Sequence, residues 1–447
     1  MRVGIFTDDF YPESGGVTRS IELQLRALAE AGHHVTLFAP DKGFTPPGEC
    51  AWEGVPSWHP PDAPSHLCSL RLWPRLASRI AADHPDLDVI HSQNERGSMF
   101  LAAQVAERLA VPHVHTFHSN YAGTHRGYPV SSALNSLTYL GWSGSWLRAL
   151  VRADRCVSLA PSRFRAEASD SPLAARDWRS LARIASAFSA FTSPAEFVVD
   201  SIVAASGDTL AERGTAVPSG VADAFGQARR RRPRGSVTRF VSAGRLGPEK
   251  RVDVLLDAFD QLGRDDAELL IIGSGSASAE RTLRQRAERI AHGQVRFLGH
   301  FTEVAALAAE FADADVFVLA SHRFDTQGMV LAEAAATGTP ILYCDDRLTV
   351  GTGPDNALRT GASATQLAAG MRELMDDRAR LERMSAASRA LAPSLSVAAM
   401  RTRYLGVYRA AVEARPERPS GEVRARRQSR ATSGRGDAGH RDQPLHP

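Results

Sequence analysis

Lysine is almost absent from this chain of 447 residues, which carries 51 arginines but only Lys42 and Lys250. Because arginine fills nearly every cationic position, a retained lysine indicates a place where a compact ammonium is needed instead of a guanidinium fork. Lys250 ends the segment Gly244-Arg-Leu-Gly-Pro-Glu-Lys250. The scarcity of lysine therefore points to this segment as a candidate functional site.

Cysteines and long apolar runs are scarce as well. The four cysteines are scattered without metal-type spacing. Reduced thiols are the main interpretation, and a Cys50–Cys68 disulfide is the alternative. No apolar run approaches the roughly 20 residues that span a bilayer, and residues 1–7 form a buried-strand pattern without a signal-peptide cleavage site. These absences predict a cytoplasmic protein, and the length predicts two domains with extra segments.

The small net charge of +3 is unevenly distributed. Residues 415–447 carry eight arginines against four carboxylates, so the rest of the chain is close to neutral. The basic character therefore gives no argument for nucleic acid as a partner. The composition of this segment predicts a disordered basic tail, either solvated or attracted to an anionic membrane surface.

Short apolar segments alternate with amphipathic segments of ten or more residues. This alternation predicts βαβ units and therefore parallel sheets. In the first half, strands are expected at Val3–Thr7, Val35–Phe38, Val89–His91 and Val114–Phe117. In the second half, strands are expected near residues 239–243, 269–272, 295–298, 316–319 and 341–343, with helices starting near residues 252, 277, 304 and 329.

The predicted organisation is two Rossmann-like domains joined by a charged segment. The boundaries are a first domain at 1–222, a basic linker at 223–237, a second domain at 238–396, a last helix at 397–414 and the tail at 415–447. The arginine-rich part of the linker is interpreted as an exposed hinge. Two such sheets place a ligand in the cleft at the carboxyl ends of both sets of strands.

Residues 119–237 are the least readable part of the sequence. Within them, residues 138–154 combine Trp142 and Trp146 with several arginines. An ordinary packed helix is the main interpretation of this pattern. A helix lying on a membrane interface is the alternative.

Two carboxylates, Asp325 and Glu333, flank a turn in which Gly328 opens a helix. A helix N-terminus suits a phosphate, and the two acids can hold sugar hydroxyls. Upstream, Arg245 and Lys250 on a strand-to-helix loop can stabilise a departing diphosphate. Together these groups predict a nucleotide-sugar site. The alternative for the upstream loop is a helix start held by a salt bridge through Glu249.

The loop after the first strand contains Gly15 and Gly16, which let the backbone approach an anion at a helix N-terminus. A simple turn is the alternative. His118 ends a strand, where its ring can enter the cleft and bond a sugar hydroxyl, or can be a satisfied buried histidine. With His113 and His115 it forms a cluster that lacks a completing carboxylate or cysteine, which disfavours zinc.

Two Asp-x-Asp triplets, Asp86–Asp88 and Asp313–Asp315, also suggest metal binding at first sight. Each immediately precedes a predicted strand. They are therefore expected at the amino ends of the strands, opposite the cleft, as turn residues. No metal site is predicted.

The combined pattern resembles the retaining glycosyltransferases of family 4, which have the GT-B fold. The matching segments are residues 6–17, 115–118, 242–250 and 324–340, in the order of the family. The resemblance implies two facing Rossmann-like domains, the first binding the acceptor, and a last helix that crosses back to the first domain. It also implies that no metal or other cofactor is required.

The resemblance assigns roles to individual residues. Gly15 and Gly16 back the diphosphate, His118 contacts the donor sugar, and Arg245 and Lys250 clamp the diphosphate. Glu333 holds the ribose, and Asp325 contacts the transferred sugar. The donor-binding stretch further includes Thr326, Gln327, Gly328, Met329 and Val330. The family usually has Glu in place of Asp325, whose carboxylate reaches one methylene less far.

The implied reaction is metal-independent transfer of a hexose with retention, by attack on the donor's front face. The sequence favours a UDP-hexose donor and an acceptor such as a glycolipid precursor, with a GDP-mannose-dependent enzyme acting on a lipid or small polyol as the alternative. A non-transferring GT-B protein, either a sugar-nucleotide epimerase or a binding module, is a second alternative. A lipid acceptor implies a cytoplasmic protein peripheral to the inner face of the plasma membrane.

Overall fold

The computed structural model describes most of the chain. The described residues are 1–9, 15–41, 50–59, 68–168, 170–233 and 235–414. Lys42 and the predicted tail at 415–447 lie outside them. None of the described helices is both long and apolar enough to traverse a bilayer. The cysteines Cys50, Cys68, Cys156 and Cys344 are all free thiols.

The first half of the chain forms a parallel sheet of seven strands in the order β3-β2-β1-β6-β7-β8-β9. The strands are β1 (Arg2–Phe6), β2 (His34–Pro40), β3 (Ala51–Val55), β6 (Val89–Ser92), β7 (His113–Thr116), β8 (Ala190–Ser193) and β9 (Gly214–Ala216). In β1, Ile5 pairs in register with Leu37 on one side and His91 on the other. Such strands are buried on both faces, which explains their nearly continuous apolar runs.

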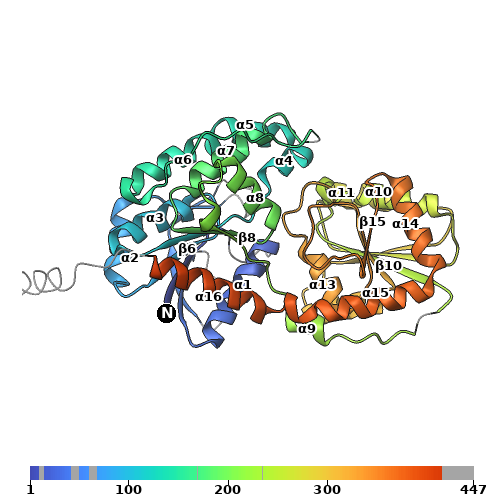
Figure 1. Cartoon of the computed structure of the whole chain (residues 1–447). Helices are drawn as coiled ribbons and strands as arrows, with labels where there is room; N and C mark the ends of the chain where they lie inside the picture. Colours follow the sequence, from blue (N-terminus) through green and yellow to red (C-terminus); the bar gives the residue numbers. More distant parts are fainter. Residues whose placement is uncertain (10–14, 42–49, 60–67, 169, 234, 415–447) are drawn as a thin grey trace, which may run out of the picture. The chain divides into compact units, whose positions relative to one another are not determined.

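Helices cover both faces of this first sheet (Figure 1). On one face, α1 (Gly16–Glu30) buries Ile21, Leu25 and Leu28 in a core with Val3 and Ile5. On the other face, α2 (Pro74–Asp83) and α3 (Gly97–Leu109) pack in a core with Phe6. Helix α8 (Glu196–Ala205) belongs to a third core, between β8 and the helices that follow α3.

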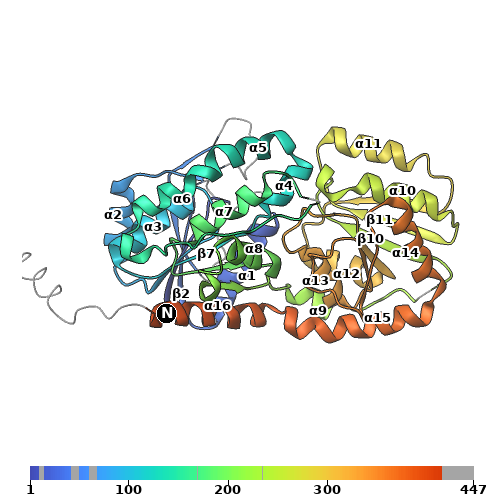
Figure 2. The ribbon, with the colours of Figure 1, turned by 45° about the horizontal axis from the view of Figure 1, so that its top comes forward.

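The first part of the stretch that was least readable from sequence, residues 119–185, contains four α-helices that pack together. They are α4 (Tyr121–Gly127), α5 (Pro129–Leu137), α6 (Tyr139–Leu150) and α7 (Ala174–Ala185). Figure 2 shows them gathered in one group, and α6 packs along α7 through Leu140 and Leu147. The expectation of a packed helix over residues 138–154 is therefore confirmed, although its outward face is exposed, as described below. A small antiparallel pair, β4 (Ser57–Trp58) and β5 (Ser69–Leu70), precedes α2.

The second half forms a parallel sheet of six strands in the order β12-β11-β10-β13-β14-β15. The strands are β10 (Thr238–Ala243), β11 (Ala267–Ile272), β12 (Gln294–Gly299), β13 (Val316–Leu319), β14 (Ile341–Tyr343) and β15 (Ala357–Arg359). The helices are α10 (Val252–Leu262), α11 (Ala277–Ala287), α12 (Val304–Asp313), α13 (Met329–Thr337), α14 (Ala364–Asp376) and α15 (Arg378–Leu391). Helices α10 and α14 cover one face, whereas α12 and α13 cover the other (Figure 2). Two doubly wound parallel sheets confirm the predicted α/β fold class.

Residues 223–237, expected as a basic linker, contain the short helix α9 (Asp223–Gln227). Its Phe225 is buried in the core of the second sheet beside Phe311, with ring centroids 5.8 Å apart. The domain boundaries themselves stay a prediction.

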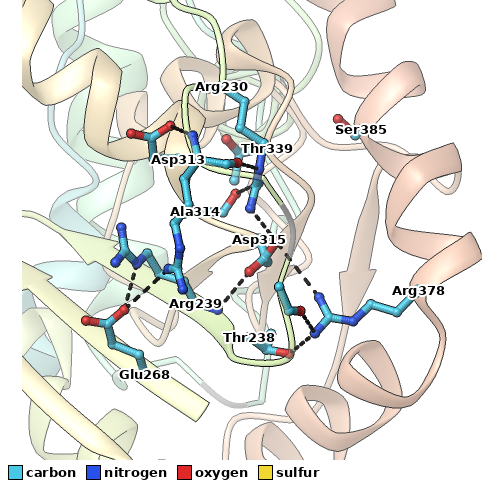
Figure 3. A network of polar contacts seen from close by, with 12 residues as sticks. Arg230, Thr238, Arg239, Glu268, Asp313, Ala314, Asp315, Thr339, Arg378 and Ser385 are labelled. Atoms are coloured by element: carbon cyan, nitrogen blue, oxygen red, sulfur yellow. Dashed lines mark hydrogen bonds and ion pairs between the residues drawn. The ribbon is translucent and has the colours of Figure 1, made fainter. Parts of the chain in front are cut away.

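The arginines that follow α9 are engaged in ion pairs (Figure 3). Arg230 lies 2.6 Å from Asp315, and Arg231 lies 2.9 Å from Asp313. Both aspartates lie just before β13, at the amino end of the second sheet, as expected, but only Asp315 is in the connecting segment, because Asp313 is the last residue of α12 (Val304–Asp313). The arginine-rich stretch is therefore attached to the amino edge of this sheet.

The last helix, α16 (Val397–Glu413), packs against the first sheet, as predicted. Tyr404 and Tyr408 are buried in the core that contains Val3 and Ile5. The Tyr408 hydroxyl lies 2.6 Å from Nδ1 of His91 and accepts a hydrogen bond of 2.8 Å from Gln24. These buried polar contacts fix the position at which the chain crosses back.

Candidate active site

The loop after β10 brings two of the predicted catalytic residues together. Gly244 leaves the strand with φ of 150°, a conformation that favours glycine, and a short 3-10 turn over Pro248–Lys250 follows. Nζ of Lys250 then lies 2.5 Å from Oδ1 of Asp325, and both side chains are largely buried. The other oxygen of Asp325, Oδ2, is buried with no hydrogen-bond partner among the described residues. This carboxylate therefore retains an acceptor position that a ligand hydroxyl can fill.

Arg245 forms a salt bridge with Glu249, which was the alternative interpretation of this loop. Its guanidinium lies 3.1 Å from Glu249, and its side chain is 65% exposed. The carboxylate of Glu249 also accepts a hydrogen bond of 3.1 Å from the hydroxyl of Tyr128. Glu249 thus holds the side chain of Arg245 at the surface of the loop. The role of Arg245 in binding the diphosphate stays a prediction.

The turn before α13 connects the two halves of the chain. Gly328 has a left-handed φ of 67° and caps the helix, which explains glycine at this position. The hydroxyl of Thr326 donates a hydrogen bond of 2.8 Å to the carbonyl of His118. The side chain of Gln327 accepts a hydrogen bond of 2.9 Å from the amide of Ser219 and donates one to its carbonyl. The side chains of Thr326 and Gln327, expected at the donor, thus bind the first half of the chain.

The N-termini of α1 and α13 lie next to each other. Gly15 caps α1 without a side-chain hydrogen bond, and Gly16 is its first residue. A Cβ atom added at Gly16 would lie 3.5 Å from the sulfur of Met329, the first residue of α13. Each helix end presents unpaired N–H groups and partial positive charge. The helix ends that carry the predicted glycines and Met329 are therefore neighbours, and their binding of an anion stays a prediction. Val330 is half-buried against the core that α12 and α13 form with the second sheet.

His118 is buried, and its Nε2 lies 2.7 Å from Oε1 of Gln93. The amide nitrogen of Gln93 donates to Gln24, which identifies the oxygen as the atom that faces His118. Burial lowers the pKa of His118 to about 4, so the ring is neutral at pH 7. With the proton on Nε2, the lone pair is on Nδ1, which can accept a hydrogen bond from a sugar hydroxyl.

Glu333 lies in the second turn of α13 and is buried. Burial raises the pKa of Glu333 to about 7, and the positive charge of Arg19 opposes this shift. A hydroxyl that donates to this carboxylate would favour its ionised form. The residue is therefore sensitive to the arrival of a polyhydroxy ligand.

His113 and His115 make contacts within the first half of the chain. His113 Nε2 and His115 Nδ1 lie 2.8 and 2.7 Å from the hydroxyl of Ser92, and both rings pack against Phe188. Burial lowers the pKa of His113 to about 3. In the part of the chain that the structure describes, no three candidate ligand side chains cluster closely enough to hold a metal ion.

Sequence reasoning missed a polar cluster at the carboxyl end of β6. Burial raises the pKa of Glu95 to about 7, and its Oε1 has no hydrogen-bond partner among the described residues. The hydroxyls of Tyr121 and Tyr139 donate to its side chain and its carbonyl, respectively. The polar run Ser92-Gln-Asn-Glu95 directly after an apolar strand was the signal that could have revealed this residue.

Asp8, in the glycine loop, has a supporting role. Its carboxylate accepts hydrogen bonds from the amide and hydroxyl of Ser98 and from the amide of Leu70. It thereby holds the start of α3 and strand β5 against the loop that follows β1.

A cavity of about 320 Å³ adjoins the loop of Lys250. Arg126 and Gly127 of α4 line one side, and Glu249 and Phe324 belong to the opposite, second-half side. Its size is in the range of small-molecule sites. The cavity lies between elements of both halves of the chain, next to the predicted site, but none of the predicted site residues is among those that line it.

Known protein families match this arrangement in both halves. A family described as Glycosyltransferase Family 4 matches residues 14–225, and one described as Glycosyl transferases group 1 matches residues 237–377. The chain belongs to glycosyltransferase family 4. The resemblance stated from the sequence motifs is therefore confirmed.

Named relatives of this glycosyltransferase include two hexosyltransferases. A GDP-mannose-dependent alpha-mannosyltransferase of Mycolicibacterium smegmatis is 29% identical over 77% of this chain and 80% of its own length. An alpha-monoglucosyldiacylglycerol synthase of Streptococcus pneumoniae is 24% identical over 76% of this chain and 70% of its own length. They confirm the expectation of a hexosyltransferase.

Solved structures confirm the GT-B fold. Anabaena HepE in complex with UDP superposes with a TM-score of 0.63 at 14% identity, covering 91% of this chain and 99% of HepE. Sucrose-phosphate synthase from Thermosynechococcus elongatus gives a TM-score of 0.60 at 17% identity, covering 91% and 98%.

Proposed function

We propose that this glycosyltransferase moves a hexose, with retention and without a metal, from a nucleotide diphosphate sugar to an acceptor hydroxyl. The observation that carries the proposal is the buried Lys250–Asp325 pair beside the N-terminus of α13. A cation for the leaving diphosphate and an acid for the sugar are then adjacent. The cationic helix end provides the third element of such a site.

In the proposed mechanism, the diphosphate binds between the N-termini of α1 and α13. The ammonium of Lys250 and the guanidinium of Arg245 take up the charge that develops as the anomeric bond breaks. A positively charged side chain thereby does the work that a metal ion does in other enzymes. The free Oδ2 of Asp325 accepts a hydroxyl of the transferred sugar.

Three further residues complete the proposed site. Nδ1 of neutral His118 accepts a second hydroxyl of the donor sugar. Glu333 ionises when the ribose hydroxyls donate to it. Glu95, buried at the carboxyl end of the first sheet with one free oxygen, accepts a hydroxyl of the acceptor.

Retention follows from front-face attack in this proposal. Asp325 is held by Lys250 and serves as a hydrogen-bond acceptor, so it is not assigned as the nucleophile of a double displacement. A donor phosphate oxygen receives the proton of the acceptor hydroxyl. The same oxygen is held by Lys250, which couples bond cleavage to proton transfer.

The donor has two candidates. The motif stretch from Asp325 to Val330 favours a UDP-hexose on sequence grounds. The relatives favour GDP-mannose, because a second GDP-mannose-dependent alpha-mannosyltransferase, from Mycobacterium tuberculosis, is 28% identical over 77% of this chain. We therefore place GDP-mannose first among the donors to be tested, ahead of UDP-glucose and UDP-galactose.

The proposed acceptor is a lipid-linked or small polyol hydroxyl. The diacylglycerol and phosphatidyl-myo-inositol in the names of relatives support a lipid. With such an acceptor, the protein works in the cytoplasm at the inner face of the plasma membrane.

The test is a donor panel with the full chain in the presence of a chelator. GDP-mannose, UDP-glucose and UDP-galactose are offered with diacylglycerol or phosphatidylinositol in mixed micelles, and nucleotide release and product are measured. NMR of the product's anomeric proton is expected to report the donor configuration. Transfer that stops in chelator and returns with Mg²⁺ would refute metal independence, and the inverted anomer would refute front-face attack.

The same panel addresses the alternative function, a GT-B protein that does not transfer. In that case the nucleotide binds in calorimetry, but neither nucleotide release nor product follows with any acceptor. An epimerase would convert the sugar instead of transferring it. The departure from family pattern at Asp325 is the observation that favours this alternative.

A further inference from the structure

Exposed large apolar side chains gather on two neighbouring helices of the first half. Of the ten such side chains on the described surface, seven lie between Tyr128 and Leu150. Six of them form what we call the α5–α6 face: Val130, Leu134, Leu137, Trp142, Trp146 and Leu150. Val130 is 83% exposed and Trp142 is 69% exposed. Monomeric soluble proteins rarely expose apolar side chains in such a contiguous group.

The exposure results from the helical period. On α6, Trp142, Trp146 and Leu150 recur every four residues, whereas Leu140 and Leu147 on the opposite side are buried in the core with α7. On α5, the outward residues have spacings of four and three, and Ser132 and Ser136 are buried. Both helices are thus anchored by one side and present an apolar stripe with the other.

The two helices themselves carry no negative charge, and the acid that follows them in the chain, Asp154, is paired with Arg152. Residues 129–150 contain no carboxylate, and their single cation, Arg148, is bonded to Val157 and Ser186. Helix α7 places two exposed arginines against the glycines of α6. A Cβ atom at Gly141 would lie 3.0 Å from the Arg176 guanidinium, and one at Gly144 would lie 2.7 Å from the Arg183 stem.

The acidic residue of α7 does not reduce this positive charge at the surface. Asp177 is buried and lies 2.8 Å from His125. Arg179, like Arg176 and Arg183, is exposed. Arg176 and Arg183 therefore lie along the side of α6 that faces α7 and keep exposed side chains, which are suited to phosphate headgroups.

We propose that the α5–α6 face docks on the surface of an anionic lipid bilayer. Trp142 and Trp146 are the side-chain type that prefers the boundary between acyl chains and headgroups. The arginines of α7 then meet lipid phosphates, which attract basic residues near the surface. An apolar stripe with a cationic border is the arrangement of helices that lie in the plane of a membrane.

The α5–α6 face continues into the candidate active site. Tyr128 joins α4 to α5, donates to Glu249, and has its ring centroid 6.3 Å from that of Phe324. Helix α4 supplies Arg126 and Gly127 to the cavity. A lipid headgroup at the docked surface is therefore close to the loop that carries Lys250. This step rests on the proposed function, because it assumes a lipid acceptor.

Vesicle co-sedimentation of the full chain tests the docking, without donor or acceptor. Wild type is expected to bind vesicles of phosphatidylcholine with phosphatidylglycerol more strongly than phosphatidylcholine alone. The W142S/W146S variant is expected to lose binding on the order of 10-fold or more, because two apolar side chains no longer enter the interface. The R176Q/R183Q variant is expected to lose most of the preference for the anionic vesicles.

Trp58→Ser is the matched control, since Trp58 is 56% exposed on β4. It should leave vesicle binding unchanged. Unchanged circular dichroism and thermal unfolding must accompany each variant, and a milder W142F/W146F variant covers the case in which serine unfolds the helix. Vesicle binding by W142S/W146S equal to wild type would overturn the proposal. So would light scattering showing that these substitutions only convert a dimer to a monomer.

The two proposals can fail separately. Vesicle binding that depends on Trp142 and Trp146, without transfer in the donor panel, supports docking and refutes the proposed function. Transfer to a micellar lipid, with vesicle binding insensitive to these tryptophans, supports the function and refutes the docking.

Discussion

The two edges of the second sheet use similar residues in opposite ways. At the amino edge, Asp315 accepts hydrogen bonds from the Arg230 side chain and the Arg239 amide, and Arg239 also pairs with Glu268 (Figure 3). Burial raises the pKa of Glu268, but hydrogen bonds from Arg239 and Arg296 outweigh it and hold this pKa below its usual value. The carboxylates of Asp315 and Glu268 at this edge are matched by arginine partners, although one guanidinium nitrogen each of Arg232 and Arg378 has no hydrogen-bond partner among the described residues.

At the carboxyl edge, partners are incomplete. Oδ2 of Asp325 has no hydrogen-bond partner among the described residues, and burial raises the pKa of Glu333 to about 7. Groups left with free hydrogen-bonding capacity in a buried position are costly unless a ligand completes them. The comparison teaches that the amino edge holds the fold together, whereas the carboxyl edge is prepared for a ligand.

The largest effect is expected at the amino edge. Asp315→Ala removes the partner of Arg230 and should lower the free energy of unfolding by about 3–5 kcal/mol, as for a broken buried pair. Urea unfolding measures this loss, and turnover per folded molecule should stay unchanged. Asp86→Ala is the control, because its pair with Arg2 is half exposed and contributes at most about 1 kcal/mol. Equal losses for the two variants would contradict the structural role of this edge.

Lys250→Ala at the carboxyl edge should instead lower turnover, with little effect on the free energy of unfolding. Without the ammonium that stabilises the leaving diphosphate, kcat should fall about 10²-fold, or about 3 kcal/mol in the barrier. Arg286→Ala, in an exposed pair with Asp257, is the matched loss of one cation and should leave kcat unchanged. Turnover of the lysine variant within threefold of wild type would remove Lys250 from the site.

Glu333 should make nucleotide binding depend on pH. Below about pH 7 the free protein carries this carboxyl protonated, so binding of the ribose hydroxyls to the ionised form must release the proton, and affinity falls. Calorimetry is expected to show about tenfold weaker binding at about pH 6 than at about pH 8. Glu333→Gln should flatten this dependence.

The control for the pH effect is Glu95→Gln. Burial also raises the pKa of Glu95 to about 7, but this residue lies at the carboxyl end of β6, outside the proposed nucleotide contacts. Its variant should retain the pH dependence of nucleotide binding. If only the Glu95 variant lost the pH dependence, the titrating carboxyl would be Glu95 and not Glu333, and the prediction would be wrong.

Lys250→Arg should give the smallest effect. The charge is kept, but a planar guanidinium cannot occupy the position of an ammonium 2.5 Å from Asp325 without a shift of either side chain. We expect a loss of roughly 3- to 10-fold in kcat, or about 1 kcal/mol. Full activity would show that charge alone matters and that the rarity of lysine carried no information about the site.

Local sequence signals predicted the regular elements well where they were strong. Helices near residues 252, 277, 304 and 329 begin at these positions in the structure, since an apolar period and capping residues identify a helix start locally. Strands β3, β8, β9 and β15 escaped prediction. The signal was weakest in β8 and β9, which have four and three residues and share one large apolar side chain, Phe191 of β8. Such short strands exist only because neighbours in the sheet pair with them.

The sequence determines the order of strands and helices, and with it the two parallel sheets. It also determines which glycines and carboxylates follow particular strands. These features depend on hydrophobic period and turn chemistry, which are properties of adjacent residues. The pairing of Lys250 with Asp325, 75 positions apart, does not follow from such properties. Nor do the raised pKa of Glu333 and the outward position of Trp142 and Trp146, which the pattern left open between core and membrane. Burial and partner choice depend on segments brought together from distant parts of the chain, so these features emerge only when the sheets and their covering helices are assembled.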